Sequence, residues 1–329
     1  MNVSRHHSHV MKINYDIIAD IHGRFDKLEA LMEGLGYEKR GDSFIAPARH
    51  KALFLGDLID PKPGHESPGG VRATLQAVKA MCDRGDALCL MGNHELNAIY
   101  FHSKGPDGKY LRVRGSKNIA MHQGSLDDFP DYDDPMSEWQ QVWIPWMKRL
   151  PFFLELEGLR AVHACWHPEM IARIGQRNFD DLAFFFAAAN KAHLEGEALE
   201  ILLKGIEVPL PHPHSLVDHT GSVRRQFRAR WWERVEKNAV CSELVFPAND
   251  QIFDWPIAEE AISQFLPYPE SEPPVFFGHY LKPAHSPLEP EKANVACLDH
   301  AAAKDGPLVA YSWRGEAQIN PQHYITHES

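Results

Sequence analysis

The chain has 329 residues, of which 44% are hydrophobic, and a formal net charge of −11 at pH 7. This length predicts two domains, or one domain with a large insertion, and the hydrophobic share is sufficient for a sizeable core. Because phosphate-backbone binding is largely electrostatic, the acidic balance argues against a nucleic-acid-binding protein.

Residues 1–12 are polar and rich in histidine, and we expect them to form a mobile tail before a single domain over residues 13–329. The first third of that domain alternates short apolar runs with segments whose apolar residues have helical spacing, which predicts a layered α/β sheet. The predicted strands are Tyr15–Ala19, Ala52–Leu55 and Ala87–Met91, and the predicted helices cover residues 25–35, 70–84 and 95–102.

Between residues 167 and 274 the pattern changes, because helical stretches alternate with proline-rich breaks. Predicted strands resume after this segment, so we interpret it as an insertion over one edge of the sheet. The acidic run Asp127–Asp134 is expected to be a solvated loop. The later predicted strands are Phe152–Leu156, Leu159–Ala164, Val275–Phe277, Asn294–Leu298 and Leu308–Trp313, and the helices of the insertion are Asp180–Lys191, Ala198–Lys204 and Arg228–Lys237.

Three polar motifs directly follow the first three predicted strands. They are Asp20-Ile21-His22-Gly23, Gly56-Asp57-Leu58-Ile59-Asp60 and Gly92-Asn93-His94-Glu95. Carboxylate, imidazole and amide ligands gathered at strand ends are what a two-metal site for phosphoryl transfer needs. Each motif alone is more often a turn or a helix cap, but three in order favour a metal site.

The spacing within the motifs suggests how the side chains are used. Asp20 and His22 are two residues apart in an extended segment, so their side chains point the same way and can share one ion. Asn93 and His94 are adjacent, so in an extended backbone they diverge. One of them can therefore bind metal while the other faces the substrate.

The motifs resemble the signature of the calcineurin-like metallophosphoesterases, and the pattern is nearest to the phosphoprotein phosphatases and the bacterial diadenosine tetraphosphatases. Two later histidines of that signature are matched by His163, in Ala161-Val162-His163-Ala164, and by His279, in Phe277-Gly278-His279. The resemblance implies an α/β fold in which two mixed sheets form a four-layer α-β-β-α sandwich with a helical insertion. It does not cover the insertion over residues 167–274.

The resemblance also implies two divalent metal ions. Asp20, His22 and Asp57 would hold the first ion, and Asp57, Asn93, His163 and His279 would hold the second. His94 would protonate the leaving-group oxygen, with Asp60 orienting its imidazole, while a hydroxide bridging the ions attacks phosphorus in line. The ligand set contains no thiolate and allows manganese, iron, zinc or cobalt, of which we favour manganese.

Three positions depart from the family pattern. One is Cys165, which stands where the family usually has glycine and which we interpret as a small buried thiol. Leu281 stands where many members have the second histidine of Gly-His-x-His, which argues against the nuclease and diesterase branches. Pro61 stands where phosphoprotein phosphatases usually carry an arginine that clamps a phosphate with two hydrogen bonds. Lys62 could replace it as a point charge, but a cationic cluster in the insertion is the better candidate. At least one of its arginines Arg225, Arg228 and Arg230 is expected to reach the phosphate.

The leading hypothesis is therefore a phosphatase acting on phosphomonoesters, either a phosphoprotein or a small phosphorylated metabolite. The alternative is a nucleoside-polyphosphate hydrolase of the diadenosine tetraphosphate type, in which Trp231 and Trp232 would stack on bases. The same segment could instead be a surface helix with both tryptophans buried underneath. A nuclease is less favoured because Leu281 replaces the second histidine. An inactive binding module is less favoured because none of the ligand positions assigned above is lost, nor is the pair of His94 and Asp60.

Five widely separated cysteines without a Cys-x-x-Cys pair are typical of a reducing compartment. The longest apolar run, Leu182–Ala189, is too short to cross a bilayer. We therefore expect a cytoplasmic protein that acts on a phosphorylated substrate and does not bind membranes. The sequence decides neither the physiological substrate nor the oligomeric state.

Overall fold

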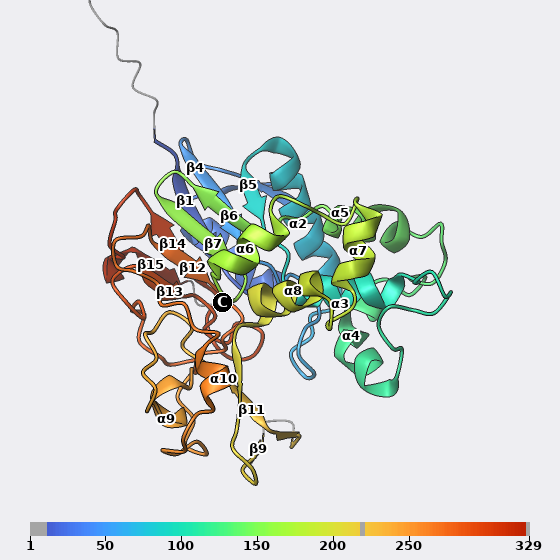
Figure 1. Ribbon diagram of the computed structural model, residues 1–329. Coiled ribbons are helices and arrows are strands. Elements are labelled where there is room, and N and C mark those ends of the chain that lie inside the picture. Colours follow the sequence, from blue (N-terminus) through green and yellow to red (C-terminus); the bar gives the residue numbers. More distant parts are fainter. Residues whose placement is uncertain (1–11, 218–220, 327–329) are drawn as a thin grey trace, which may run out of the picture.

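The computed structural model describes residues 12–217 and 221–326 (Figure 1). Nearly all of the predicted tail over residues 1–12 therefore lies outside the described residues. Lys12 is described, and its Nζ lies 3.1 Å from the carbonyl oxygen of Gly315 and 5.0 Å from the ring centre of Trp313. Within the described ranges, no helix is long and apolar enough to cross a membrane.

Two mixed sheets form the centre of the molecule. Their strands are β1 (Asn14–Ile18), β4 (His50–Phe54), β5 (Ala87–Cys89), β6 (Phe153–Leu156), β7 (Leu159–Val162), β12 (Val275–Phe277), β13 (Val295–Cys297), β14 (Val309–Trp313) and β15 (Tyr324–Thr326). The first sheet has the order β15-β14-β1-β4-β5, in which β1, β4 and β5 are parallel. The second has the order β13-β12-β7-β6, in which only β6 is antiparallel to its neighbour. All eight strands predicted from the sequence are confirmed within a few residues; β15 was not predicted.

Alternate residues of both sheets form one apolar cluster. Ile17 of β1, Leu53 of β4, Ala161 of β7 and Phe276 of β12 belong to it and are completely buried. Their neighbours in the strands, such as Ile18, belong to a second cluster that includes the helices. The strands are thus buried on both faces, which explains why they read as continuous apolar runs.

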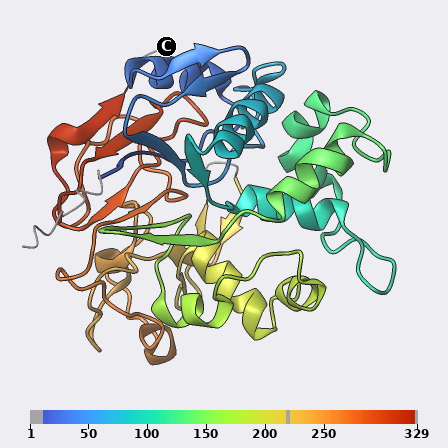
Figure 2. The same ribbon diagram turned by 90° about the horizontal axis from the view of Figure 1, so that it is seen from above.

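The predicted helices of the first third are confirmed. The described helices are α1 (Phe25–Gly34), α2 (Gly70–Arg84), α3 (Asn93–His102), α4 (Ser116–Asp128), η1 (Trp139–Trp143), α5 (Ile144–Met147), α6 (Pro168–Ile174), α7 (Leu182–Ala188), α8 (Leu194–Lys204), α9 (Cys241–Leu244), α10 (Glu259–Ile262) and η2 (Pro321–His323). Seen from above, α3, α4 and α5 lie on the side of the molecule away from β14 and β15 (Figure 2). Of these, α4 and α5 were not predicted, and α3 begins at Asn93, so Asn93 and His94 are helical and not extended as we expected.

The acidic run predicted as a loop is partly helical, because α4 continues to Asp128. The Asp128 carboxylate accepts hydrogen bonds from the backbone N–H groups of Gly69, Val71 and Arg72, at 2.8, 2.9 and 3.1 Å. Gly69 precedes α2 and has no side chain to cap it. Asp128 therefore caps α2 from a distant part of the chain.

The segment over residues 167–274 begins with α6, α7 and α8, which contact one another. It continues with irregular chain and the short strands β8 (Glu207–Pro209), β9 (Leu216–Val217), β10 (Val223–Arg224) and β11 (Gln226–Arg228). A two-stranded hairpin, β2 (Glu38–Arg40) and β3 (Ser43–Ile45), lies earlier in the chain.

The helix predicted over Arg228–Lys237 is wrong, because β11 ends there and irregular chain follows. Trp231 and Trp232 both pack on Phe277, with ring centres 5.4 and 5.5 Å away. In a helix the side chains of adjacent residues point about 100° apart, so only one of two neighbouring rings would face Phe277 directly. Irregular backbone allows both rings to pack on it.

Candidate metal centre

The three motifs lie at the carboxyl ends of β1, β4 and β5, as the sequence predicts. His22, Asp57, Asp60 and His279 have φ values of +50°, +53°, +63° and +65°, and they are four of the six described non-glycine residues with positive φ. Such backbone is costly for residues with a side chain and concentrates at functional sites. The backbone N–H groups of Ile21 and His22 both donate to the carbonyl oxygen of Asp57, at 3.0 and 2.8 Å, which holds the first two motif loops together.

The second and third motif loops touch through their glycines. A Cβ on Gly56 would lie 2.4 Å from the backbone nitrogen of Gly92, and one on Gly92 would lie 2.3 Å from that of Asp57. The completely buried Glu95 carboxylate then accepts from the backbone N–H groups of Asp57, Leu58 and Gly92, at 2.8 to 2.9 Å. Sequence reasoning missed Glu95, although a glutamate three residues after a helix N-cap is a known capping signal.

Asp57 lies at the centre of the predicted ligands. Its Oδ2 is 3.6 Å from His22 Nε2, and its Oδ1 is 3.4 Å from His163 Nε2. The same His163 nitrogen is 3.1 Å from Asn93 Oδ1. Two groups of potential ligands therefore share Asp57, one with His22 and His94 and the other with His163 and His279, and in each group the ligand atoms lie within 4.8 Å of one another.

Asp20 completes the predicted set. Its Oδ2 accepts the backbone N–H of His279 at 2.9 Å, which ties the β1 motif to the loop after β12. Burial raises the pKa of Asp20 to about 7, and the Asp57 charge adds to this rise, while His163 opposes it. Two buried carboxylates so close together need positive charge between them, which divalent ions would supply.

Backbone carbonyls orient two of the imidazoles. His22 Nδ1–H donates to the carbonyl oxygen of Ile59 at 2.9 Å, and His163 Nδ1–H donates to that of Leu55 at 2.8 Å. In the neutral imidazole this leaves Nε2, which faces Asp57, as the atom that can bind a metal ion. The Nε2 of His279 is buried and has no hydrogen-bond partner among the described residues. An orphaned buried imidazole nitrogen beside two carboxylates fits a metal ligand.

Burial also affects how these histidines titrate. It lowers the pKa of His22 to about 3, so this imidazole is neutral and free to bind a cation. Burial and the Arg228 charge lower the pKa of His279 well below its ordinary value. For His163, burial acts in the same direction, but Asp57 and Asp20 outweigh it and raise the pKa to about 9.

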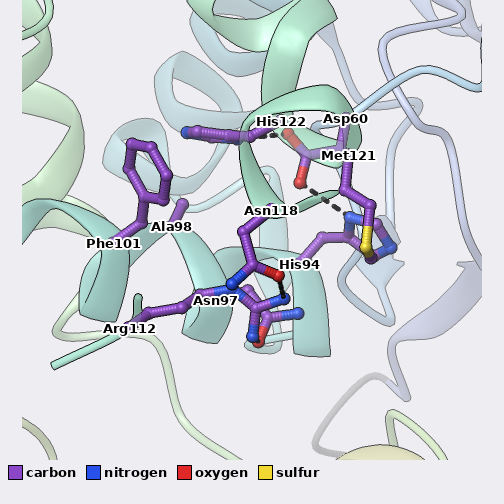
Figure 3. Close-up of a pocket in the computed structure, with 9 residues that line it drawn as sticks. All are labelled: Asp60, His94, Asn97, Ala98, Phe101, Arg112, Asn118, Met121 and His122. Carbon is purple, nitrogen blue, oxygen red and sulfur yellow. Dashed lines mark hydrogen bonds and ion pairs between the residues drawn. The ribbon is translucent and has the colours of Figure 1, made fainter. Parts of the chain in front are cut away.

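His94 and Asp60 form the predicted pair, with 2.7 Å between His94 Nδ1 and Asp60 Oδ2 (Figure 3). The other carboxylate oxygen, Oδ1, accepts from His122 Nδ1–H at 2.5 Å and from Ser125 Oγ–H at 2.6 Å. Burial would raise the pKa of Asp60, but His122 and His94 hold it well below its usual range. His122 and Ser125 belong to α4, which sequence reasoning did not predict.

Asp299 is a further buried carboxylate that the sequence analysis did not select. It follows β13, whose carboxyl end lies at the same edge as those of β12 and β7. Burial, and then the charge of Asp20, raise the pKa of Asp299 well above its ordinary value. The strand-end rule that located the other ligands could have found it.

The predicted arginines have different environments. Arg228 places one terminal nitrogen 3.5 Å from the carbonyl oxygen of His279, and its Nε is buried without a partner among the described residues. Arg230 donates from Nε to the carbonyl oxygen of Val245 at 3.3 Å, and Arg225 is exposed. Lys62 is partly buried, and its charge contributes to lowering the pKa of His22, so it lies near the centre.

Trp231 and Trp232 are each 1% exposed. Their rings are part of the core and cannot stack on a nucleotide base, so the role we considered for them in a nucleoside-polyphosphate hydrolase is wrong. The interpretation in which both are buried is confirmed, although their own segment is not a helix.

A sequence model of the family described as calcineurin-like phosphoesterase matches residues 13–283. The chain is 36% identical over 97 residues to the asymmetrical bis(5'-nucleosyl)-tetraphosphatase PrpE of Bacillus velezensis, an alignment that covers 30% of this chain and 36% of that protein. It thus spans just over a third of that relative's length.

A symmetrical bis(5'-nucleosyl)-tetraphosphatase of Hamiltonella defensa is 23% identical over 312 residues, which cover 91% of this chain and 93% of the other. Among solved structures, a cold-active protein-tyrosine phosphatase of a psychrophilic Shewanella species superposes with a TM-score of 0.49 and 16% identity, over 96% of this chain and 81% of that one.

Proposed function

Because this chain belongs to the calcineurin-like phosphoesterase family and is a hydrolase, we propose that it hydrolyses phosphate esters or anhydrides with the help of two divalent metal ions. The observation that carries the proposal is the arrangement around Asp57, where two groups of potential ligands share one carboxylate. The hydrogen-bonded pair of His94 and Asp60 beside this carboxylate adds a proton donor.

The residues that would hold the ions are those the family signature matches. Asp20, His22 and Asp57 would bind the first ion, and Asp57, Asn93, His163 and His279 the second. Asp299 is a candidate for a further ligand of the first ion. Besides burial, the charge of Asp20 raises the pKa of Asp299, so the two carboxylates are near each other. Leu281 occupies the position of the histidine that many family members use there. When bound, the ions supply Lewis acidity that polarises phosphate and water.

His94 would act as the general acid. Its Nδ1–H donates to Asp60, and its Nε2, 4.0 Å from Asp57 Oδ2, faces the metal ligands. The Nε2–H of the imidazolium can therefore pass its proton to a leaving oxygen, which would otherwise depart as a costly alkoxide. Asp60 fixes the orientation of the ring.

Arg228 is the candidate to bind the transferred phosphoryl group, because its Nε is buried and unpartnered next to His279. A guanidinium can contact two phosphate oxygens at once, which Pro61 cannot do. Lys62 would add a second positive charge close to the centre. Arg225 and Arg230 are weaker candidates, because Arg225 is exposed and Arg230 donates to a backbone carbonyl.

A phosphomonoester, either a phosphoprotein or a small metabolite, is one candidate substrate. A dinucleoside polyphosphate is a second candidate, favoured by the similarity to proteins named as bis(5'-nucleosyl)-tetraphosphatases. Manganese is the ion we favour among manganese, iron, zinc and cobalt.

We also propose that one domain covers residues 13–329 with an insertion over 167–274, and that the two sheets are the inner layers of an α-β-β-α sandwich. The apolar cluster shared by the sheets, and the second cluster that joins their other faces to helices, support this layering.

The test uses the purified chain, stripped of metal by chelation and reloaded separately with each of the four ions. A generic aryl phosphate and diadenosine tetraphosphate serve as substrates. We expect reloading to restore hydrolysis, and Asp57→Asn to lower the rate by at least about 100-fold through loss of the shared carboxylate. Asp83→Asn, on the exposed side of α2, is the matched control and should keep full activity. Unchanged hydrolysis after exhaustive chelation would contradict the proposal.

A further inference from the structure

Arg112 lies in the loop between α3 and α4 and is partly buried. One terminal nitrogen donates to Asn97 Oδ1 on α3 at 2.7 Å, and the other donates to Asn118 Oδ1 on α4 at 3.0 Å. Figure 3 shows this guanidinium between the two amides, in a pocket that His94 and Asp60 also line. The cation is therefore fixed in place beside the proposed general acid.

The positive charge of Arg112 has no contacting carboxylate among the described residues. Two other arginines of this region, Arg114 and Arg72, form ion pairs with Asp133 and Glu138. The partners of Arg112 are neutral amides, and they use two of its five N–H donors. Its other three donors make no hydrogen bond to a described residue, and its charge is unpaired in a chain with more acidic than basic residues.

A purely structural arginine would be expected to look different. An arginine that only links two helices holds them more strongly when its partner is a carboxylate, because both partners are then charged and two parallel N–H···O bonds can form. Burial lowers the pKa of Arg112, and Asp60 and Glu200 partly oppose this. A cation that is partly desolvated and unpaired is stabilised when an anion binds.

We propose that Arg112 binds a phosphate of the leaving group, so that the preferred substrates are those in which the scissile bond joins two phosphates. This inference rests on the proposed function, in which His94 protonates the leaving oxygen. His94 belongs both to a group of potential metal ligands and to the lining of the Arg112 pocket. The Arg112 pocket and the potential metal ligands thus meet at His94, whereas Arg228 lies beside the ligand His279.

The reaction on such a substrate balances without a further reactant. Water adds its oxygen to the transferred phosphorus, the bond from that phosphorus to the bridging oxygen breaks, and His94 gives its proton to the bridging oxygen. The proton released by water restores the acid. Arg112 would neutralise the charge that grows on the departing phosphate chain.

The test compares wild type with Arg112→Met, Arg112→Lys and Asn118→Ala on two substrates. An aryl phosphate has a leaving group without phosphate, and diadenosine tetraphosphate has one with phosphate. Arg112→Met should lower kcat/KM for the dinucleotide by about 10- to 100-fold, because a charged hydrogen-bonded contact is lost. The rate with the aryl phosphate should fall by no more than about 3-fold. Arg112→Lys and Asn118→Ala should lie between wild type and Arg112→Met on the dinucleotide alone.

The control variant is Lys117→Met, which removes a charge from the exposed face of α4 and should change neither rate. A second readout is binding of adenosine triphosphate, a product-like anion, measured by calorimetry without turnover. It should weaken about 10- to 100-fold in Arg112→Met. Equal losses on both substrates, or unchanged binding of adenosine triphosphate, would overturn the role of Arg112. A wild type that hydrolyses neither substrate, while Arg112→Met still loses binding, would contradict the proposed function instead.

Discussion

His122 Nδ1 lies 2.5 Å from Oδ1 of Asp60, the carboxylate whose other oxygen is bound to His94. Two buried imidazoles thus hold one carboxylate from opposite sides, and Ser125 adds a third hydrogen bond. The proposed acid is positioned by Asp60, and Asp60 is itself positioned by α4. The helix α4, which sequence reasoning did not predict, therefore supports the proposed catalytic pair of His94 and Asp60.

Replacing His122 with phenylalanine should lower kcat by about 10- to 100-fold, the usual cost of losing a partner that orients a site residue. Phenylalanine keeps the ring contacts with Phe101 and Trp139 but leaves Asp60 Oδ1 with Ser125 alone. kcat should change more than KM, because His122 acts on the proposed acid through Asp60. Steady-state kinetics and the melting temperature check the prediction. His65→Phe, in a loop that faces Asp305, is the control, and an unchanged kcat in His122→Phe would refute the role.

The positions of the candidate ligands at strand ends could be predicted because the apolar strand and the polar motif after it are both local signals in the sequence. A buried strand is visible as an apolar run, and the polar motif follows it directly, so Asp20, Asp57 and Asn93 needed no knowledge of distant contacts. His163 and His279 were found only through the family signature. The structure brings all of them around Asp57.

The parts that escaped prediction depend on long-range packing. His122 and Ser125 lie 62 and 65 residues from Asp60, on a helix with few apolar residues, so no periodicity marked them. Trp231 and Trp232 are buried by distant aromatic rings that override a weak helical pattern. Arg112 was missed because its partners are amides on two different helices.

Asp128 provides a test of packing away from the proposed chemistry. Its carboxylate accepts three backbone N–H groups at the start of α2, where Gly69 cannot cap. Asp128→Ala should lower the free energy of unfolding by about 1 to 2 kcal/mol, the usual range for a lost helix cap. Urea denaturation of the metal-free protein measures the change. The control is the neighbouring Asp127→Ala, which removes an exposed carboxylate that caps no helix. An equal decrease in the free energy of unfolding in both variants would show that Asp128 does not cap α2.

His102 should make the protein sensitive to acid. It is 9% exposed, and burial, together with the charges of His122 and Arg114, lowers its pKa to about 2 from an ordinary value of 6.5. Between these two values the unfolded chain binds one proton more than the folded chain at this residue. The contribution of His102 to the free energy of unfolding is therefore most favourable above pH 6.5 and falls by about 1.4 kcal/mol for each pH unit below it.

His102→Phe removes this titration and keeps an aromatic ring against Tyr132 and Trp139. Any constant effect of the substitution cancels when the free energies of unfolding at pH 7.0 and pH 5.0 are subtracted. We expect that difference to be smaller in the variant by about 2 kcal/mol. The exposed His285→Phe should leave it close to the wild-type value. An equal pH dependence in His102→Phe and wild type would show that His102 takes up its proton without unfolding, and that its burial does not control acid stability.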